Sequence, residues 1–187
     1  NLLNAKEGYF LGYWQSEKYF LPIENIIRRE FVLKKEHVIE NQELLSLITN
    51  HESVSLHVRR GDYVANSTTL KMHGVCTPEY YRRAIDAIKQ KISKPYFFVF
   101  SDDPEWVKSN FAFTDPYRII SAEGYADYQE LSIMSHCKHN IIANSSFSWW
   151  GAWLSENKEK KVLYPRNWFN DRSINTEDLF PNLWTKI

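Results

Sequence analysis

From residue 53 onward, short apolar runs alternate with segments of helical pattern, and this alternation is the strongest constraint on the fold. The expected strands cover residues 53–57, 96–100, 118–121, 141–143 and 161–164. In the first of them, Val54, Leu56 and Val58 are expected to share one face. The second strand, YFFVF, is apolar throughout, which is typical of a strand buried on both faces of a parallel sheet. Strands that alternate with helices predict an α/β fold, a Rossmann-like parallel sheet with helices on both faces.

The expected helices lie between these strands, and two of them have clear start signals. Thr77 suits an N-cap and Pro78 suits the first helical position, so a helix is expected from there to about residue 92. Asp103 before Pro104 has the same pattern and predicts a short helix. Helices are also expected over residues 127–137 and 145–156, and a polar loop is expected between the first strand and Cys76.

The sequence predicts a division of the chain into three parts. Residues 1–50 have a helical pattern, with Ile23, Ile26, Ile27 and Phe31 on one face of a helix that has Pro22 in its first turn. A second, shorter helix is expected over residues 43–48. The Rossmann-like domain is expected over residues 51–170, and residues 171–187 are expected to form a loop-like tail.

Charge and composition exclude several classes of protein. Lys and Arg number 23 and Asp and Glu number 23, so the formal net charge is zero and a general nucleic-acid binder is not expected. No apolar run approaches the ~20 residues that cross a bilayer, so no membrane span is expected. The 7 Trp, 11 Tyr and 11 Phe residues are expected mainly in the core, although a carbohydrate-binding module remains an alternative.

Polar clusters follow three of the expected strands, at residues 57–63, 101–103 and 144–148. Ligands of parallel α/β sheets bind outside the carboxyl ends of the strands, so these clusters should meet at one edge. His57 and Arg59 share a face of their strand, and Arg59 rather than Arg60 is expected to face the cleft. The alternative is a surface ion pair between an arginine and Asp62.

Residues 145–148 open a helix with the sequence SSFS. Free N–H groups and hydroxyls at a helix N-terminus can bind an anion, although ordinary N-capping explains most such sequences. An arginine presents a planar fork of donors that matches phosphate oxygens. The arginine and the helix start at one sheet edge together predict a phosphate site, and more specifically a diphosphate site.

Three motifs carry a resemblance to a known family. They are HVRRGDY at 57–63, FVFSDDPEW at 98–106, and the run from MSHCKHN to SSFSWWGAWL at 134–154. In these motifs the chain resembles the bacterial α-1,2-fucosyltransferases of glycosyltransferase family 11, over essentially its whole length. The Gly-rich segment with which the family begins is absent. The resemblance therefore implies the C-terminal donor domain of a GT-B-like enzyme, with residues 1–50 linking it to a missing N-terminal acceptor domain.

The same resemblance implies a reaction and its partners. L-fucose would move from GDP-fucose to the 2-hydroxyl of a terminal galactose of an oligosaccharide, with inversion, no obligatory metal and no cofactor. Use of another GDP-sugar is the alternative within the same fold. A bacterial cytoplasmic location, with the inner face of the inner membrane as a further option, is expected because the donor is a nucleotide sugar and no signal or anchor is in view.

The resemblance also implies roles for individual residues. Arg59 is expected to be catalytic on the β-phosphate, and Asp62 is expected to order Arg60 or to act near the acceptor. His57 would lie beside the nucleotide, and Glu130 would pair with the guanine base unless it is a solvated helix carboxylate. Hydroxyl and helix N–H groups for the donor are expected from Ser145, Ser146, Phe147 and Ser148.

Overall fold

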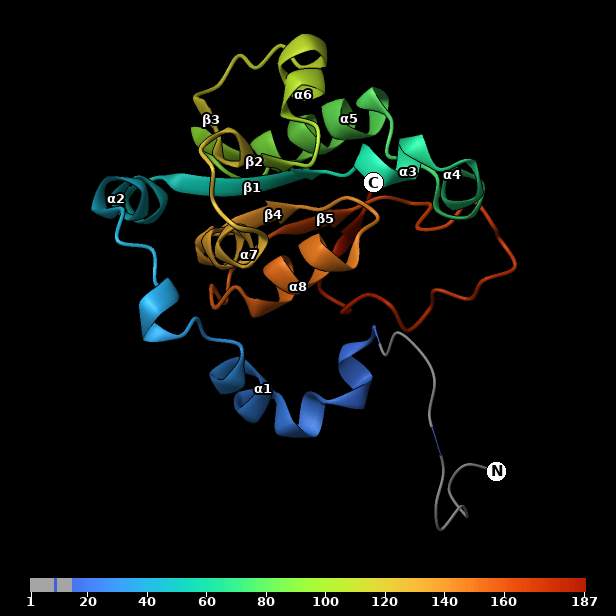
Figure 1. Cartoon of the computed structure of the whole chain (residues 1–187), viewed down its shortest axis with the longest axis horizontal. Coiled ribbons are helices and arrows are strands. Elements are labelled where there is room, and N and C mark those ends of the chain that lie inside the picture. The colour runs from blue at the N-terminus through green and yellow to red at the C-terminus, as the bar shows by residue number, and fades with distance from the viewer. Residues whose placement is uncertain (1–8, 10–14) are drawn as a thin grey trace.

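The computed structural model describes residue 9 and residues 15–187 (Figure 1). In these residues one sheet has six strands in the order β3-β2-β1-β4-β5-β6, and every neighbouring pair is parallel. The strands are β1 Glu52–Val58, β2 Pro95–Ser101, β3 Tyr117–Ile119, β4 His139–Ile141, β5 Val162–Tyr164 and β6 Thr185–Lys186. This is the order of a doubly wound Rossmann sheet, which confirms the expected fold class. The chain reverses direction across the sheet between β1 and β4, where such sheets bind ligands.

The strands differ from the expected ones mainly at the end of the chain. The third strand ends at Ile119, and Ile120–Ala122 continues as a 3-10 helix. Strand β6 lies in the part expected to be loop, and it pairs with Leu163 and Tyr164 of β5. Two residues are too few for a periodic signal, so only their long-range pairing identifies this strand.

Eight α-helices are described, and two of them lie where a loop was expected. The helices are α1 Glu24–Glu30, α2 Gln42–Asn50, α3 Gly61–Ala65, α4 Ser67–His73, α5 Pro78–Lys89, α6 Pro104–Asn110, α7 Asp127–His136 and α8 Ser146–Leu154. Helices α3 and α4 replace most of the expected loop, so that prediction was wrong. The Asn66 side chain caps α4 by accepting the N–H groups of Thr68 and Thr69. Thr77 and Asp103 cap α5 and α6 as expected.

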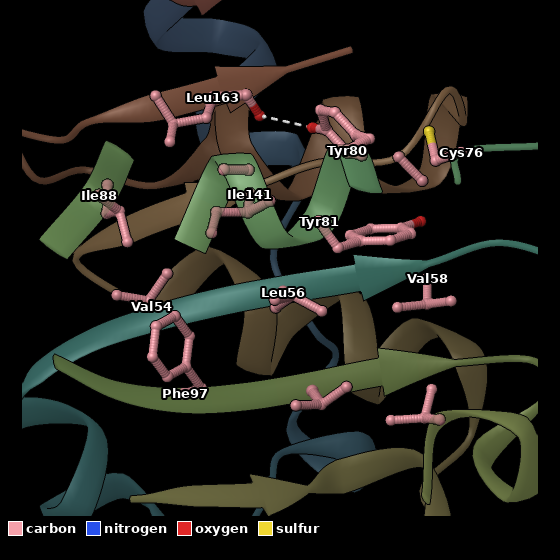
Figure 2. Packing of buried hydrophobic residues seen from close by; sticks show 14 residues of the cluster. Val54, Leu56, Val58, Cys76, Tyr80, Tyr81, Ile88, Phe97, Ile141 and Leu163 are labelled. Carbon is pink, nitrogen blue, oxygen red and sulfur yellow. Dashed lines mark hydrogen bonds between the residues drawn. The ribbon is translucent and has the colours of Figure 1, made fainter. Parts of the chain in front are cut away.

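One face of the sheet packs against α5 and α6 (Figure 1). The β1 side chains Val54, Leu56 and Val58 share this face, as their alternation predicted, and they lie opposite Tyr81 of α5 (Figure 2). The Tyr80 hydroxyl donates to the carbonyls of β5 Leu163, at 3.4 Å, and of Ile142, at 2.6 Å. These bonds satisfy a polar group inside an otherwise apolar layer.

The other face packs against α2, α7 and α8. Helix α7 places Ile133 and Met134 against Phe98 of β2, and α8 crosses close to α7. A Cβ atom on Gly151 of α8 would lie 2.4 Å from the Met134 Sδ atom, so this approach requires glycine.

The tryptophans of α8 belong to the layer that covers this second face of the sheet. Trp149 and Trp153 are fully buried or nearly so, and they pack with Trp168 and Trp184 from the C-terminal part of the chain. An exposed flat row of aromatic rings, which a carbohydrate-binding module would need, is therefore not formed by these α8 residues.

The N-terminal helix differs from its expected form. It is split into the 3-10 helix Leu21–Ile23 and α1, and Ile23, Ile26 and Phe31 are 46–49% exposed. Helix α1 contacts the end of α8, because Arg28 donates to the Leu154 carbonyl at 3.0 Å. None of the helices in the described residues is both long and apolar enough to cross a membrane.

Candidate active site

The three polar clusters that follow the strands line one cleft at the carboxyl edge of the sheet, as the sequence predicted. Its volume is about 840 Å³. The order of the strands sets the order of its lining residues: Ser121 follows β3, Asp102 follows β2, Arg59 follows β1 and Ser145 follows β4. The cleft therefore crosses the switch point of the sheet, with Arg59 near its middle.

Arg59 lines the cleft and is held by two carboxylates. Its Nη2 atom lies 2.7 Å from Asp62 Oδ1, and its Nη1 atom lies 3.1 Å from Asp102 Oδ2. Arg60 is turned away, with its guanidinium 3.9 Å from the Trp106 ring centre. The choice of Arg59 over Arg60 is therefore supported by the geometry. The ion pair with Asp62 that was the alternative is formed by Arg59, whereas the expected ordering of Arg60 by Asp62 was wrong, because one helical turn places Asp62 beside Arg59.

Asp102 also fixes the main chain that carries Arg59. Its Oδ1 atom accepts the Arg60 N–H at 2.8 Å. A Cβ atom on Gly61 would lie 2.7 Å from Asp102 Oδ2, so the glycine allows the turn to approach the carboxylate. One carboxylate thus orients both the backbone after β1 and the guanidinium, a role that the sequence did not reveal.

His57 lies at the floor of the cleft and is 4% exposed. Burial, and then the charge of Arg59, lowers the pKa of His57 to about 3. The ring is therefore neutral at pH 7, and its Nδ1 atom has no hydrogen-bond partner among the described residues. The ring centre lies 5.5 Å from that of Phe147. A neutral imidazole in this position can accept or donate one hydrogen bond to a ligand.

Glu130 of α7 lies at the β3 end of the cleft. Its Oε2 atom accepts a hydrogen bond from the Ser121 hydroxyl at 2.9 Å. Burial raises the pKa of Glu130 to about 7, against the lowering effect of this hydrogen bond, and Asp127 raises the pKa further. Glu130 is thus a half-buried carboxyl inside the cleft and not a solvated helix carboxylate.

The N-terminus of α8, which follows β4, also lines the cleft. Ser145, Ser146 and Phe147 line the cleft, and no side chain in the described part of the chain caps this helix. Its first N–H groups therefore present partial positive charge. Ser148 is not at the cleft, contrary to expectation. Its hydroxyl is buried and donates to the carbonyls of Ala143 and Ser145 at 3.3 and 3.2 Å.

Several lining residues were not predicted, because they come from segments expected to be loop. They include His73 from α4 and Trp168, Phe169 and Leu179 from the chain after β5. Asn144 joins these segments: its Nδ2 atom donates to the carbonyls of His73 at 2.9 Å, Gly74 at 3.3 Å and Trp168 at 3.2 Å. The sequence shows only an asparagine directly after an expected strand, which does not identify its distant partners.

Comparison with known proteins identifies the family. The sequence profile of Glycosyl transferase family 11 matches residues 1–187. An alpha-1,2-colitosyltransferase of Escherichia coli is 41% identical, over 95% of this chain and 62% of that protein. The O-antigen biosynthesis glycosyltransferase WbnK of Escherichia coli is 36% identical, over 97% of this chain and 63% of that protein.

A galactoside 2-alpha-L-fucosyltransferase of Caenorhabditis elegans is 29% identical, over 94% of this chain and 51% of that protein. The chain thus spans less than two thirds of the length of each of these relatives. The match to the family profile extends over every residue of the chain, which therefore belongs to glycosyl transferase family 11.

Proposed function

We propose that this chain forms the donor-binding part of an inverting, metal-independent transferase that moves L-fucose from GDP-fucose to the 2-hydroxyl of a terminal galactose. The observation that carries the proposal is the placement of Arg59 and the N-terminus of α8 in one cleft, after the adjacent strands β1 and β4. Both groups suit a diphosphate, and the cleft lies at the switch point where such sheets bind nucleotides.

The diphosphate of the donor binds between these two groups. The Arg59 guanidinium donates to the β-phosphate, and the first N–H groups of α8 donate to phosphate oxygens, together with the hydroxyls of Ser145 and Ser146. When the bond between the sugar and the β-phosphate breaks, negative charge develops on the departing GDP. Fixed donors aimed at that charge lower the barrier, and the chain can supply them through Arg59 and α8 without a metal ion.

The guanine base binds at the β3 end of the cleft. The Glu130 carboxylate accepts hydrogen bonds from guanine N1–H and N2–H, which are two parallel donors that match its two oxygens. The Ser121 hydroxyl already donates to Oε2 and so fixes the orientation of the carboxylate. The neutral His57 ring lies beside the nucleotide and carries no charge that would compete with Arg59 for the phosphates.

Asp62 acts as a positioning residue in this proposal. Its contact with Arg59 at 2.7 Å, together with that of Asp102 at 3.1 Å, holds the guanidinium in one orientation before the donor arrives. An arginine that is already ordered loses less side-chain entropy when it binds phosphate. This arrangement supports a role for Asp62 through Arg59, in place of the expected role near the acceptor.

A second candidate reaction uses the same cleft with a colitosyl donor. The observation that favours it is the 41% identity to a protein named as an alpha-1,2-colitosyltransferase. The groups proposed for the base and the diphosphate are the same in both reactions. Only the sugar end of the donor distinguishes them.

Calorimetric titration of the chain with GDP, GDP-fucose, GDP-colitose, GDP-mannose and UDP tests the proposal, with each titration repeated in EDTA. Binding of GDP and GDP-fucose, weak binding of UDP and no effect of EDTA are the expected results. Tighter binding of GDP-colitose than of GDP-fucose would favour the second candidate. Equal affinity for GDP and UDP would refute the proposed guanine contact, and loss of binding in EDTA would refute metal independence.

A further inference from the structure

The cleft has two ends of different chemistry. At the β3 end lie the polar groups of Ser121 and Glu130, and from Arg59 toward the ends of β4 and β5 lie the rings of Tyr63, His73 and Phe169, here called the aromatic end. From β3 to β5 the sheet edge crosses four strand spacings, which is about 19 Å. The cleft is therefore long enough to hold a base, a diphosphate and a sugar ring in a row.

The aromatic end is a continuous row of rings. The ring centres of Tyr63 and His73 are 5.0 Å apart with an interplanar angle of 25°, and those of His73 and Phe169 are 5.4 Å apart at 46°. All three side chains are partly exposed and line the cleft, and the apolar side chains of Trp168 and Leu179 also line it. The row begins next to Arg59, whose guanidinium lies 5.4 Å from the Tyr63 ring centre.

Main-chain hydrogen bonds hold this surface in place. Besides the three bonds from Asn144, the Asn170 N–H donates to the Met72 carbonyl at 2.9 Å and the Asn170 side chain donates to the Leu70 carbonyl at 3.0 Å. Figure 1 shows the segment after β5 passing beside α4. Gly74 has a φ of +67°, and a Cβ atom there would lie 2.5 Å from Asn170 Oδ1. Bonds to the main chain thus tie the two segments of the aromatic end together, which favours a preformed surface of the kind that small-molecule sites usually have.

We infer that the aromatic end binds the pyranose ring of the donor and contacts its 6-deoxy carbon. This inference rests on the proposed function, which places the base at Glu130 and the β-phosphate at Arg59. The sugar then lies on the far side of Arg59, which is where the aromatic end begins. Pyranose rings present C–H groups that pack on aromatic faces, and a methyl group at C6 suits the apolar side chains of Phe169 and Leu179. Fucose and colitose both carry that methyl group, whereas mannose has a hydroxymethyl group there.

The test compares GDP with GDP-fucose on the variants Phe169→Ala and His73→Ala. The measured quantity is the ratio of the two dissociation constants, because the nucleotide part is common to both ligands. We expect this ratio to shift against GDP-fucose by about tenfold in each variant, because removing part of the wall of a substrate pocket has an effect of this order, while the affinity for GDP stays within about twofold. The preference for GDP-fucose over GDP-mannose should fall in the same variants.

Tyr117→Ala is the matched control. Tyr117 is an aromatic residue at the start of β3, 47% exposed, and it packs on Phe113 outside the cleft with ring centres 4.4 Å apart. Its removal should leave both affinities unchanged. Melting curves identify any variant that fails to fold, and Phe169→Leu and His73→Gln then replace the alanine variants, because they keep most of the side-chain volume but remove the aromatic row.

Three results would overturn the inference. An unchanged ratio in folded variants would show that the sugar does not contact these rings. An equal loss for GDP and GDP-fucose would place the nucleotide, and not the sugar, at the aromatic end. A parent chain that binds neither GDP nor GDP-fucose would refute the proposed function as well, and this outcome is distinguished from the other two because it requires no variant.

Discussion

Glu130 is expected to make the affinity for GDP depend on pH. Its pKa is raised to about 7, and only the ionised carboxylate accepts both guanine N–H groups. With this pKa, about 9% of the side chain is ionised at pH 6 and about 91% at pH 8. The apparent affinity scales with the competent fraction, so GDP should bind about tenfold more weakly at pH 6 than at pH 8, which is about 1.4 kcal/mol.

The assay is calorimetric titration with GDP at pH 6, 7 and 8 and constant ionic strength, on the parent and on Glu130→Gln. The variant keeps the size of the side chain and one carbonyl acceptor but does not titrate. Any change that it still shows comes from groups other than Glu130, such as the phosphates of the ligand, and the difference between the two curves isolates Glu130. His57 does not contribute to this difference, because burial keeps its pKa at about 3. Parallel curves for parent and variant would refute the proposed contact between Glu130 and the base.

The same carboxyl should affect the stability of the protein. Its pKa is higher in the folded state than the value of about 4.5 in the unfolded chain, so the folded state holds the proton more tightly. The free energy of unfolding should therefore fall as the pH rises from about 4.5 to 7, by about 1–2 kcal/mol after allowance for the partial exposure of the group. Glu130→Gln should be more stable than the parent at pH 8 and similar to it near pH 5, as measured by urea unfolding. If the difference in stability between parent and variant is the same at both pH values, folding does not raise the pKa of Glu130.

Three further substitutions test the neighbouring geometry. Arg59→Ala should weaken GDP binding by roughly 2–5 kcal/mol, which is the usual range for the loss of one partner of a buried charge pair. If titration finds an affinity for GDP within twofold of the parent, Arg59 does not bind the phosphate. Arg60→Ala should lower the melting temperature, because the side chain packs on Trp106, and should leave the affinity for GDP within about twofold. Gly151→Ala should lower the free energy of unfolding by about 1–3 kcal/mol in urea titrations, because its Cβ atom would collide with Met134. An unchanged midpoint would mean that the Met134 side chain, or α7 and α8 as a whole, move apart without cost.

The parts of the fold that the sequence predicted are those with a local signal. The alternation in β1 correctly assigned Val54, Leu56 and Val58 to one face, and the same reasoning placed Arg59 rather than Arg60 in the cleft. The N-caps at Thr77 and Asp103 were also correct, because a cap depends on residues within one turn. The meeting of the three polar clusters at one edge of the sheet was predicted from the parallel arrangement of the strands alone.

The parts that were missed depend on contacts between distant segments. Strand β6 exists only through its pairing with β5, and the aromatic end combines residues from α3, α4 and the chain after β5. The position of Ser148 was predicted wrongly because a helix start does not reveal which hydroxyls turn back to the carbonyls behind it. Asp62 was assigned to the wrong arginine because Arg59 and Arg60 both lie within three residues of it, and the sequence does not decide which guanidinium contacts the carboxylate.

Asn144 has a consequence for how the sugar specificity of such a site can change. All the bonds from its side-chain nitrogen go to main-chain carbonyls, those of His73, Gly74 and Trp168. A main-chain acceptor is present whatever side chain a residue carries, so exchange of His73 or Trp168 leaves these bonds available. The bonds that hold the aromatic end in position therefore do not depend on the side chains that face the ligand. A single side chain can keep the wall in position while substitutions along it adapt the cleft to a different sugar.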